Sequence, residues 1–211
     1  IGKKSVWLYN IEQPEFVTEL HRRYIEAGSE LIQANTFSVN RFSVERESEL
    51  SAAEVVTAAV KLAKQAAEGT GVRVYATFGP LPILMEPYGK LSIAETEAAY
   101  TELASAAAEA GADIIVLETF MDLRMMEVAA KAAKSFGLPV FCSMTFAKRH
   151  RTMMGDTVKK IAQSLETIGA DAVGMNCSAG PVEALEIIRE FKENTALPLY
   201  FKPNSGMGES Y

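Results

Sequence analysis

The chain has 211 residues, of which 48% are hydrophobic and 23% are charged, and it carries a formal net charge of -6 with an isoelectric point near 5.1. This composition predicts one sizeable hydrophobic core and excludes the extended basic surface that follows a nucleic-acid backbone. The densest basic stretch runs only from Lys148 to Arg151, and we expect it to be a solvated loop. No nucleic-acid partner is expected.

Cysteine content and apolar run length bear on the cellular compartment. Two cysteines, Cys142 and Cys177, are too few for a disulfide framework. No apolar run approaches the roughly 20 residues that a membrane-spanning helix needs. The first residues, IGKKSVWLYN, lack a signal-peptide pattern and an initiator Met. We therefore expect a cytoplasmic protein without a membrane partner, present here as a fragment or a processed product.

Short apolar runs alternate with longer amphipathic stretches along the whole chain. The runs are typical of strands buried on both faces, as in a parallel sheet. They cover residues 31–37, 72–78, 113–120, 139–146, 171–178 and 198–204. Because no linker or low-complexity segment interrupts the alternation, we expect a single, incomplete barrel domain over residues 1–211.

The first long amphipathic stretch, residues 14–27, predicts a helix. Phe16, Leu20, Tyr24 and Ala27 fall on one stripe of it, which is typical of a helix face that packs against a core.

Capping residues mark three further helices, over residues 92–110, 123–134 and 181–191. Ser92 and Glu95 have the spacing of a capping box, Asp122 precedes the second of these helices, and Pro181 suits the first turn of the third. Glycines are expected to close the helices before the strands, and these are Gly28, Gly111, Gly137 and Gly169. Two of these junctions repeat as Gly-Ala-Asp, at 111–113 and 169–171, which indicates one recurring strand–helix unit.

Two architectures fit repeated strand–helix alternation: an eight-stranded (β/α) barrel and an open doubly wound sheet. No Gly-x-Gly-x-x-Gly follows the first predicted strand, which disfavours a dinucleotide-binding sheet. Polar residues gather at the carboxyl ends of several strands, and a barrel brings those ends together on the face where barrel enzymes act. We therefore predict an α/β fold, a (β/α)8 TIM-type barrel with about six βα units visible and the first and eighth strands not apparent.

Glu118 ends the apolar run DIIVLE and is the leading candidate for a substrate-binding residue. A carboxylate there needs a partner, which makes it either a structural ion pair or helix cap, or a group that binds a substrate ammonium or acts as a general base. We favour the second interpretation because Cys177 is expected at the same barrel mouth. Asn35, Thr36 and Asn176, at other strand ends, are further candidates for substrate binding.

Cys177 is compatible with three roles: a small buried apolar side chain, a thiol activated by the helix that starts near Pro181, and a metal ligand. Neither histidine is well placed as its base, since His21 lies in the first helix and His150 in the basic loop. One cysteine alone does not complete a zinc site. Lys202, at the end of the last strand, is either the Schiff-base lysine of a barrel lyase or a solvated or salt-bridged residue.

Six stretches carry a more specific signal when they are taken in order: HRRYIEAGSELIQANTFSVNR, GPLPILMEPYG, GADIIVLETFMDLRM, LPVFCSMTF, GADAVGMNCSAGP and YFKPNSG. Together they cover nearly the whole chain. In this order they resemble the homocysteine S-methyltransferase family, which includes the homocysteine-binding module of cobalamin-dependent methionine synthase and the betaine-dependent enzyme.

The resemblance implies methyl transfer to the thiol of homocysteine, with methionine as the product. It implies that Cys177 is the first of three zinc ligands and that an adjacent Cys-Cys pair in a glycine-rich loop supplies the other two. Homocysteine's sulfur would complete a tetrahedral Zn2+ site, and Glu118 would bind the amino group of homocysteine.

The implied partners are homocysteine and a methyl donor, and the sequence leaves the donor open. Methylcobalamin, methyltetrahydrofolate by way of cobalamin, betaine and S-methylmethionine all remain candidates. No cobalamin-binding Asp-x-His-x-x-Gly stretch occurs in the chain, so cobalamin or folate is expected only through another module or protein.

The sequence departs from the family pattern at both ends. Nothing before Val6 matches the family's first strand, which ends in Asp-Gly, and the chain stops at Tyr211 before any Cys-Cys pair. A second interpretation is therefore a non-catalytic fragment or degenerate barrel scaffold with a weak amino-acid pocket. Open strand edges in such a chain also predict self-association.

Overall fold

The computed structural model describes residues 4–178 and 180–204. Six strands form one sheet, and they are β1 (Leu31–Gln33), β2 (Arg73–Phe78), β3 (Ile114–Phe120), β4 (Val140–Met144), β5 (Ala172–Asn176) and β6 (Leu199–Lys202). The α-helices are α1 (Tyr9–Glu12), α2 (Pro14–Glu26), α3 (Arg41–Val44), α4 (Ala52–Ala67), α5 (Ile93–Glu109), α6 (Leu123–Lys134), α7 (Val158–Ile168) and α8 (Pro181–Asn194). Two short 3-10 helices, η1 (Val6–Leu8) and η2 (Lys148–His150), complete the set. None of the helices in the described residues is both long and apolar enough to cross a bilayer.

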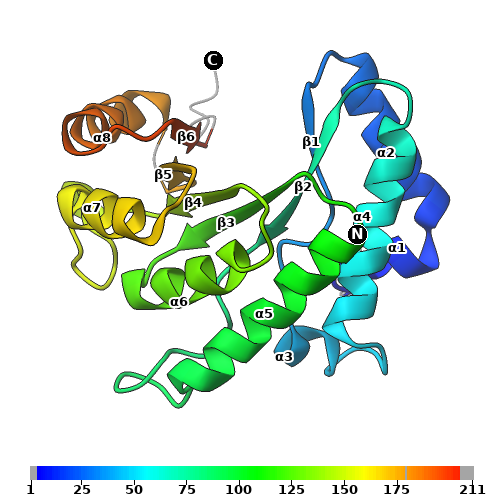
Figure 1. Cartoon of the computed structure of the whole chain (residues 1–211), viewed down its shortest axis with the longest axis horizontal. Helices are drawn as coiled ribbons and strands as arrows, with labels where there is room; N and C mark the ends of the chain where they lie inside the picture. Colours follow the sequence, from blue (N-terminus) through cyan, green and yellow to red (C-terminus); the bar gives the residue numbers. More distant parts are fainter. Residues whose placement is uncertain (1–3, 179, 205–211) are drawn as a thin grey trace.

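The order of the strands distinguishes the two predicted architectures. All neighbouring strands are parallel, and they follow one another as β1-β2-β3-β4-β5-β6 without a reversal. A doubly wound sheet reverses its strand order at a switch point, whereas a barrel does not. Figure 1 shows that the sheet curls and that helices α4 to α8 follow its outer side. The prediction of a TIM-type barrel is confirmed as a partial barrel of six strands, five of which are followed by a helix within the described residues.

The strands bury different residues on their two faces because side chains alternate along a strand. The outer face contributes Val74, Ile115, Cys142 and Val173 to the large core beneath the helices. The inner face holds a small apolar cluster built on Tyr75, Ile114 and Val116, with Leu31, Phe141 and Tyr200 packed against it. The lower part of the barrel interior is therefore apolar.

The two Gly-Ala-Asp junctions perform the same structural task. Asp113 accepts a hydrogen bond of 2.7 Å from a backbone N–H at the start of β2 and pairs with Lys64 at 3.0 Å. Asp171 accepts one of 2.7 Å from a backbone N–H at the start of β4 and pairs with Lys134 at 2.8 Å. Each aspartate ties a helix end to the amino end of a neighbouring strand, which confirms the recurring unit.

The predicted helix boundaries are confirmed by their caps. Ser92 and Glu95 form a capping box on α5, and Asp122 accepts a hydrogen bond from the N–H of Arg124 at the start of α6. Pro181 occupies the first turn of α8. The four glycines expected after helices all have positive φ, namely Gly28 (97°), Gly111 (90°), Gly137 (75°) and Gly169 (84°).

The first strand is shorter than the predicted 31–37. It ends at Gln33, and the chain then turns tightly, with the N–H of Thr36 donating to the carbonyl of Ala34 at 2.8 Å. The remaining polar residues of this run therefore lie in a loop above the sheet.

The apolar stripe of α2 does not pack against the core as predicted. Phe16, Leu20 and Tyr24 are 56%, 44% and 59% exposed, whereas Val17 and His21 on the neighbouring face are buried. The reason is that α2 packs on α1 and α4 through the face that carries Val17 and His21. The stripe instead borders an apolar groove of about 750 Å³ between α2 and β1.

Candidate substrate-binding site

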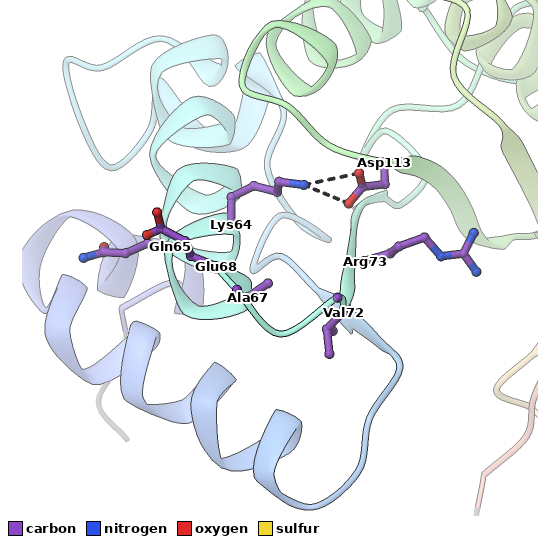
Figure 2. Close-up of a pocket in the computed structure, with 9 residues that line it drawn as sticks. Lys64, Gln65, Ala67, Glu68, Val72, Arg73 and Asp113 are labelled. Atoms are coloured by element: carbon purple, nitrogen blue, oxygen red, sulfur yellow. Dashed lines mark hydrogen bonds and ion pairs between the residues drawn. The ribbon is translucent and has the colours of Figure 1, made fainter.

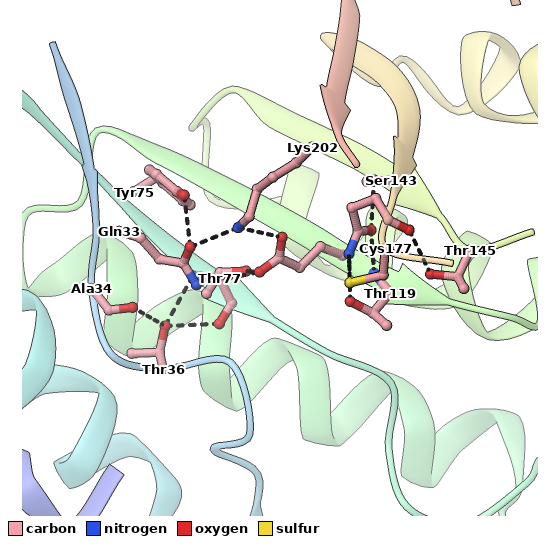
Figure 3. A network of polar contacts seen from close by, with 12 residues as sticks. Gln33, Ala34, Thr36, Tyr75, Thr77, Thr119, Ser143, Thr145, Cys177 and Lys202 are labelled. Atoms are coloured by element: carbon pink, nitrogen blue, oxygen red, sulfur yellow. Dashed lines mark hydrogen bonds and ion pairs between the residues drawn. The ribbon is translucent and has the colours of Figure 1, made fainter. Parts of the chain in front are cut away.

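The last inward-facing residue of every strand is polar. These residues, at the carboxyl ends of β1 to β6 in order, are Gln33, Thr77, Glu118, Ser143, Asn176 and Lys202. Figure 3 shows that hydrogen bonds connect side chains from this set across the mouth of the curled sheet. The arrangement follows from the period of two along each strand, which places one polar ring above the apolar interior.

Glu118 lies at the centre of this ring, with its side chain only 5% exposed. Its Oε1 accepts hydrogen bonds from Thr77 Oγ1 at 2.9 Å and from Gln33 Nε2 at 3.3 Å. Its Oε2 accepts one from the ammonium of Lys202 at 3.0 Å. Glu118 therefore has the ion-pair partner and the hydrogen-bond donors that a buried carboxylate requires.

Two tyrosines line the space below Glu118. The hydroxyl of Tyr75 donates to Gln33 Oε1 at 2.8 Å. Burial, together with the negative charge of Glu118, raises the pKa of Tyr200 to about 12, and burial also raises the pKa of Tyr75. Both phenols therefore stay protonated at neutral pH, and within the described residues the buried hydroxyl of Tyr200 has no hydrogen-bond partner.

Asn176 links the two halves of the site through its buried side chain. Its Oδ1 accepts from the backbone N–H of Thr119 and from Ser143 Oγ, both at 2.8 Å. Its Nδ2 donates to Thr119 Oγ1 at 2.7 Å and to Cys177 Sγ at 3.3 Å. Asn176 therefore fixes the residue after Glu118 and contacts the sulfur of Cys177 at the same time.

Three residues at this end of the sheet have a left-handed backbone that is rare outside glycine. They are Thr119 at φ 69°, Cys177 at 55° and Ser178 at 56°. Such conformations cost on the order of 1–3 kcal/mol each and persist where surrounding contacts hold them. The two hydrogen bonds between Thr119 and Asn176 supply such contacts for Thr119.

The two cysteines occupy different environments, and both are free. Cys142 is fully buried on the outer face of β4, and this burial raises the pKa of its thiol to about 12. Cys177 is partly exposed just after β5, and its backbone N–H donates to the carbonyl of Lys202 at 3.1 Å. Lys202 therefore contacts both Cys177, through its backbone, and Glu118, through its ammonium.

The described residues do not form a complete metal site. No group of three or more His, Cys, Asp or Glu side chains able to hold a metal ion occurs among them. A zinc site needs three or four protein ligands in tetrahedral geometry, and Cys177 is one donor. His21 is buried within α2, where burial lowers its pKa, and His150 pairs with Glu186 and Glu190. Neither histidine joins Cys177 in a ligand set within these residues.

Two of the predicted substrate-binding residues make local structural contacts. Asn35 Nδ2 donates to the carbonyl of Val6 at 2.9 Å and to Asn10 at 3.1 Å. Thr36 is buried, and its hydroxyl donates to the carbonyl of Thr77 at 2.8 Å and accepts from the N–H of Thr77 at 3.0 Å. Thr36 therefore fastens the loop after β1 to β2.

Gln33 and Tyr75 were missed as site residues by sequence reasoning. Both lie inside predicted strands, whereas the candidate site residues were chosen from the polar residues at strand ends. A count of alternate positions back from each strand end would have identified Gln33 as an inward-facing polar residue.

Two cavities lined by described residues can be compared with this site. One, of about 570 Å³, lies at the amino ends of β2 and β3, where Lys64 and Asp113 form the ion pair drawn in Figure 2. Residues at that end of a barrel typically contribute to stability rather than to catalysis. The other is the groove between α2 and β1, which reaches Gln33, Tyr75 and Lys202. The ring around Glu118 is thus open to the groove.

Comparison with known proteins agrees with this geometry. The family model described as homocysteine S-methyltransferase matches residues 3–211. Methionine synthase of Mycobacterium leprae (strain TN) is 29% identical over 216 residues, and that of Mycobacterium tuberculosis (strain ATCC 25618 / H37Rv) is 28% identical over 220 residues. Both matches cover 95% of this chain and 18% of the relative, so the chain spans about a fifth of the length of these relatives.

Solved structures show the same fold. The apo form of the homocysteine methyltransferase MmuM from Escherichia coli has a TM-score of 0.79 at 21% identity, covering 97% of this chain and 77% of that one. Its metallated form has a TM-score of 0.81 at 20% identity, covering 94% and 75%. Because the family model matches nearly the whole of this chain, the chain belongs to the homocysteine S-methyltransferase family.

Proposed function

We propose that this chain is the homocysteine-binding part of an enzyme that transfers a methyl group to the thiol of homocysteine, giving methionine. The observation that carries the proposal is the buried carboxylate of Glu118 at the same end of the sheet as the partly exposed Cys177, in a chain of this family. Lys202 contacts both residues, so amine recognition and sulfur chemistry would occur side by side.

Glu118 would bind the α-ammonium of homocysteine. Its oxygens accept hydrogen bonds from a hydroxyl, an amide and an ammonium, which supports a role for Glu118 as the acceptor for a ligand donor. A charge-assisted hydrogen bond to a buried carboxylate is among the stronger polar contacts available to a ligand. The amide of Asn176 would keep the backbone after Glu118 in place while the ligand binds.

Cys177 would be one ligand of a Zn2+ ion. The amide of Asn176 donates to its sulfur, and outer hydrogen bonds of this kind are typical of metal-bound side chains. Bound zinc stabilises a thiolate at neutral pH, which makes a thiol a better nucleophile. The two further ligands would be a Cys-Cys pair that these 211 residues do not contain, and the residues described do not make the site by themselves.

The methyl donor would be delivered by another module or another protein. Cobalamin and folate both fit this arrangement, since the chain has no cobalamin-binding Asp-x-His-x-x-Gly stretch of its own. A Schiff-base lyase is less well supported, because a lysine that forms a Schiff base reacts as a neutral amine and Lys202 is paired with Glu118.

Substitution of the two cysteines tests this proposal in the full natural polypeptide. We expect Cys177→Ala to lose both stoichiometric zinc, measured by atomic absorption after dialysis, and methionine formation from homocysteine. Cys142→Ala is the matched control, because Cys142 is buried on the outer face of β4 and should keep both. Retention of one zinc per chain in Cys177→Ala would remove Cys177 from the ligand set and favour the scaffold interpretation.

A further inference from the structure

The charges around Glu118 bear on how an amino acid is recognised. Glu118 is nearly fully buried, and Lys202 is the cation that pairs with it among the described residues. The side chain of Lys202 is 46% exposed, so one member of the pair is fixed and the other reaches toward solvent and the groove. The pair as it stands is neutral.

An incoming ammonium changes this balance. If a ligand places an ammonium on Glu118, one carboxylate then faces two cations, and the buried site carries a net positive charge. Uncompensated charge in a poorly solvated site is unfavourable. An α-amino acid brings its own carboxylate on the adjacent carbon, which restores neutrality, whereas a simple amine does not.

Lys202 has the geometry to meet that carboxylate. Its ammonium donates to Gln33 Oε1 at 2.9 Å and to Glu118 Oε2 at 3.0 Å, which uses two of its three N–H groups within the described residues. A lysine has a flexible four-carbon stem, so its ammonium can turn a short distance without moving the backbone. The backbone of Lys202 is held by β5 through the N–H of Cys177.

We propose that Lys202 binds the α-carboxylate of the substrate, so that Glu118 and Lys202 together select a zwitterionic amino acid over an amine of the same shape. This inference rests on the proposed function, because it assumes an amino-acid substrate. Glu118 takes the ammonium, Lys202 swings from Glu118 toward the carboxylate, and the four charges alternate in sign. Gln33 remains as the second acceptor for Lys202.

The test compares two ligands without a free thiol, so that binding does not depend on zinc. These are L-methionine and its decarboxylated analogue methylthiopropylamine, titrated calorimetrically into the full natural polypeptide. We expect the unmodified protein to prefer L-methionine. Lys202→Met should weaken L-methionine binding by roughly 10- to 100-fold, the range for a hydrogen bond to a charged group, and leave the amine unaffected or bound more tightly.

Two further variants separate recognition from structural support. Lys202→Arg keeps the positive charge and should retain most of the preference for L-methionine. Lys159→Met changes an exposed lysine in α7 and should behave like the unmodified protein. Thermal denaturation of each variant shows whether it is folded. A folded Lys202→Met that loses both ligands by the same factor, or loses neither, overturns the inference.

The proposed function fails in a different way. If the unmodified protein forms methionine but Lys202→Met keeps its preference for L-methionine, the function stands and the role of Lys202 is wrong. If the unmodified protein binds neither ligand at millimolar concentration, both proposals are overturned.

Discussion

Cys142 and Cys177 show how far position decides the chemistry of one residue type. Cys142 belongs to the core between β4 and the outer helices, and its burial raises the pKa of the thiol to about 12. Cys177 lies beyond the end of β5, where the backbone leaves the sheet and the side chain is partly exposed. Thiolate is the reactive form of cysteine, so the two residues should differ in reactivity.

We predict that iodoacetamide modifies Cys177 much faster than Cys142 in the native protein. At pH 8 a thiol with the pKa of Cys142, about 12, is ionised to about one part in ten thousand, and it is also shielded from reagent. Mass spectrometry of the digested protein would give the two rates. In denaturant the rates should become similar, and equal rates in the native protein would contradict this account of the site.

Individual site residues were easier to predict from the sequence than the residues that contact them. Glu118 and Cys177 stand out because each follows an apolar run, and the family motifs support both. The pairing of Glu118 with Lys202 joins residues 84 positions apart, and only the register of the three strand pairs from β3 to β6 brings them together. Thr36 was predicted as a substrate-binding residue from its position, but position does not reveal that its hydroxyl is already used by Thr77.

At the scale of elements, the identity of the strands was predictable and their ends were not. All six predicted runs contain a strand, yet the first stops at Gln33 because the chain turns at Ala34. The turn depends on hydrogen bonds to β2, which lies about 40 residues further along, so no local pattern encodes it. Helix starts were predicted well, since a capping box is a local interaction.

The junction of β5 and β6 is the element that positions Lys202. Gly174 faces Tyr200 in this pair, and a Cβ on Gly174 would lie 1.8 Å from the carbonyl oxygen of Tyr200. The clash is with backbone, which cannot rotate away as a side chain can. A glycine here therefore permits the close approach of β6, and with it the placement of Lys202 beside Glu118.

We predict that Gly174→Ala lowers the free energy of unfolding by roughly 3 kcal/mol or more, because it overpacks a backbone contact. Gly69→Ala is the control, since Gly69 has φ +72° and nothing within 4 Å of an added Cβ; it should cost about 1–2 kcal/mol for the left-handed backbone alone. Urea denaturation measures both. Equal losses would mean that β6 can shift without cost.

At the scale of the whole molecule, the sheet has two edges and one exposed apolar helix face. Within the described residues β1 pairs only with β2, and β6 pairs only with β5. The stripe of α2 lies beside the β1 edge, and Phe16, Leu20 and Tyr24 are exposed along the groove. Amphipathicity predicted this stripe, but the sequence pattern of one helix does not state which neighbour covers it.

Open edges and contiguous apolar surface favour association with another chain. We therefore predict that the 211-residue chain self-associates in a concentration-dependent way, measured by sedimentation velocity. Leu20→Glu should weaken the association by roughly tenfold or more, because burying a leucine contributes about 1.5–3 kcal/mol. Val182→Glu, at a position that is 80% exposed on α8 and away from the groove, is the matched control and should have little effect. If both substitutions dissociate the assembly equally, general charge repulsion explains the result; if Leu20→Glu alone does so, the surface between α2 and β1 is the contact, and the chain reaches its stable form only when that surface is covered.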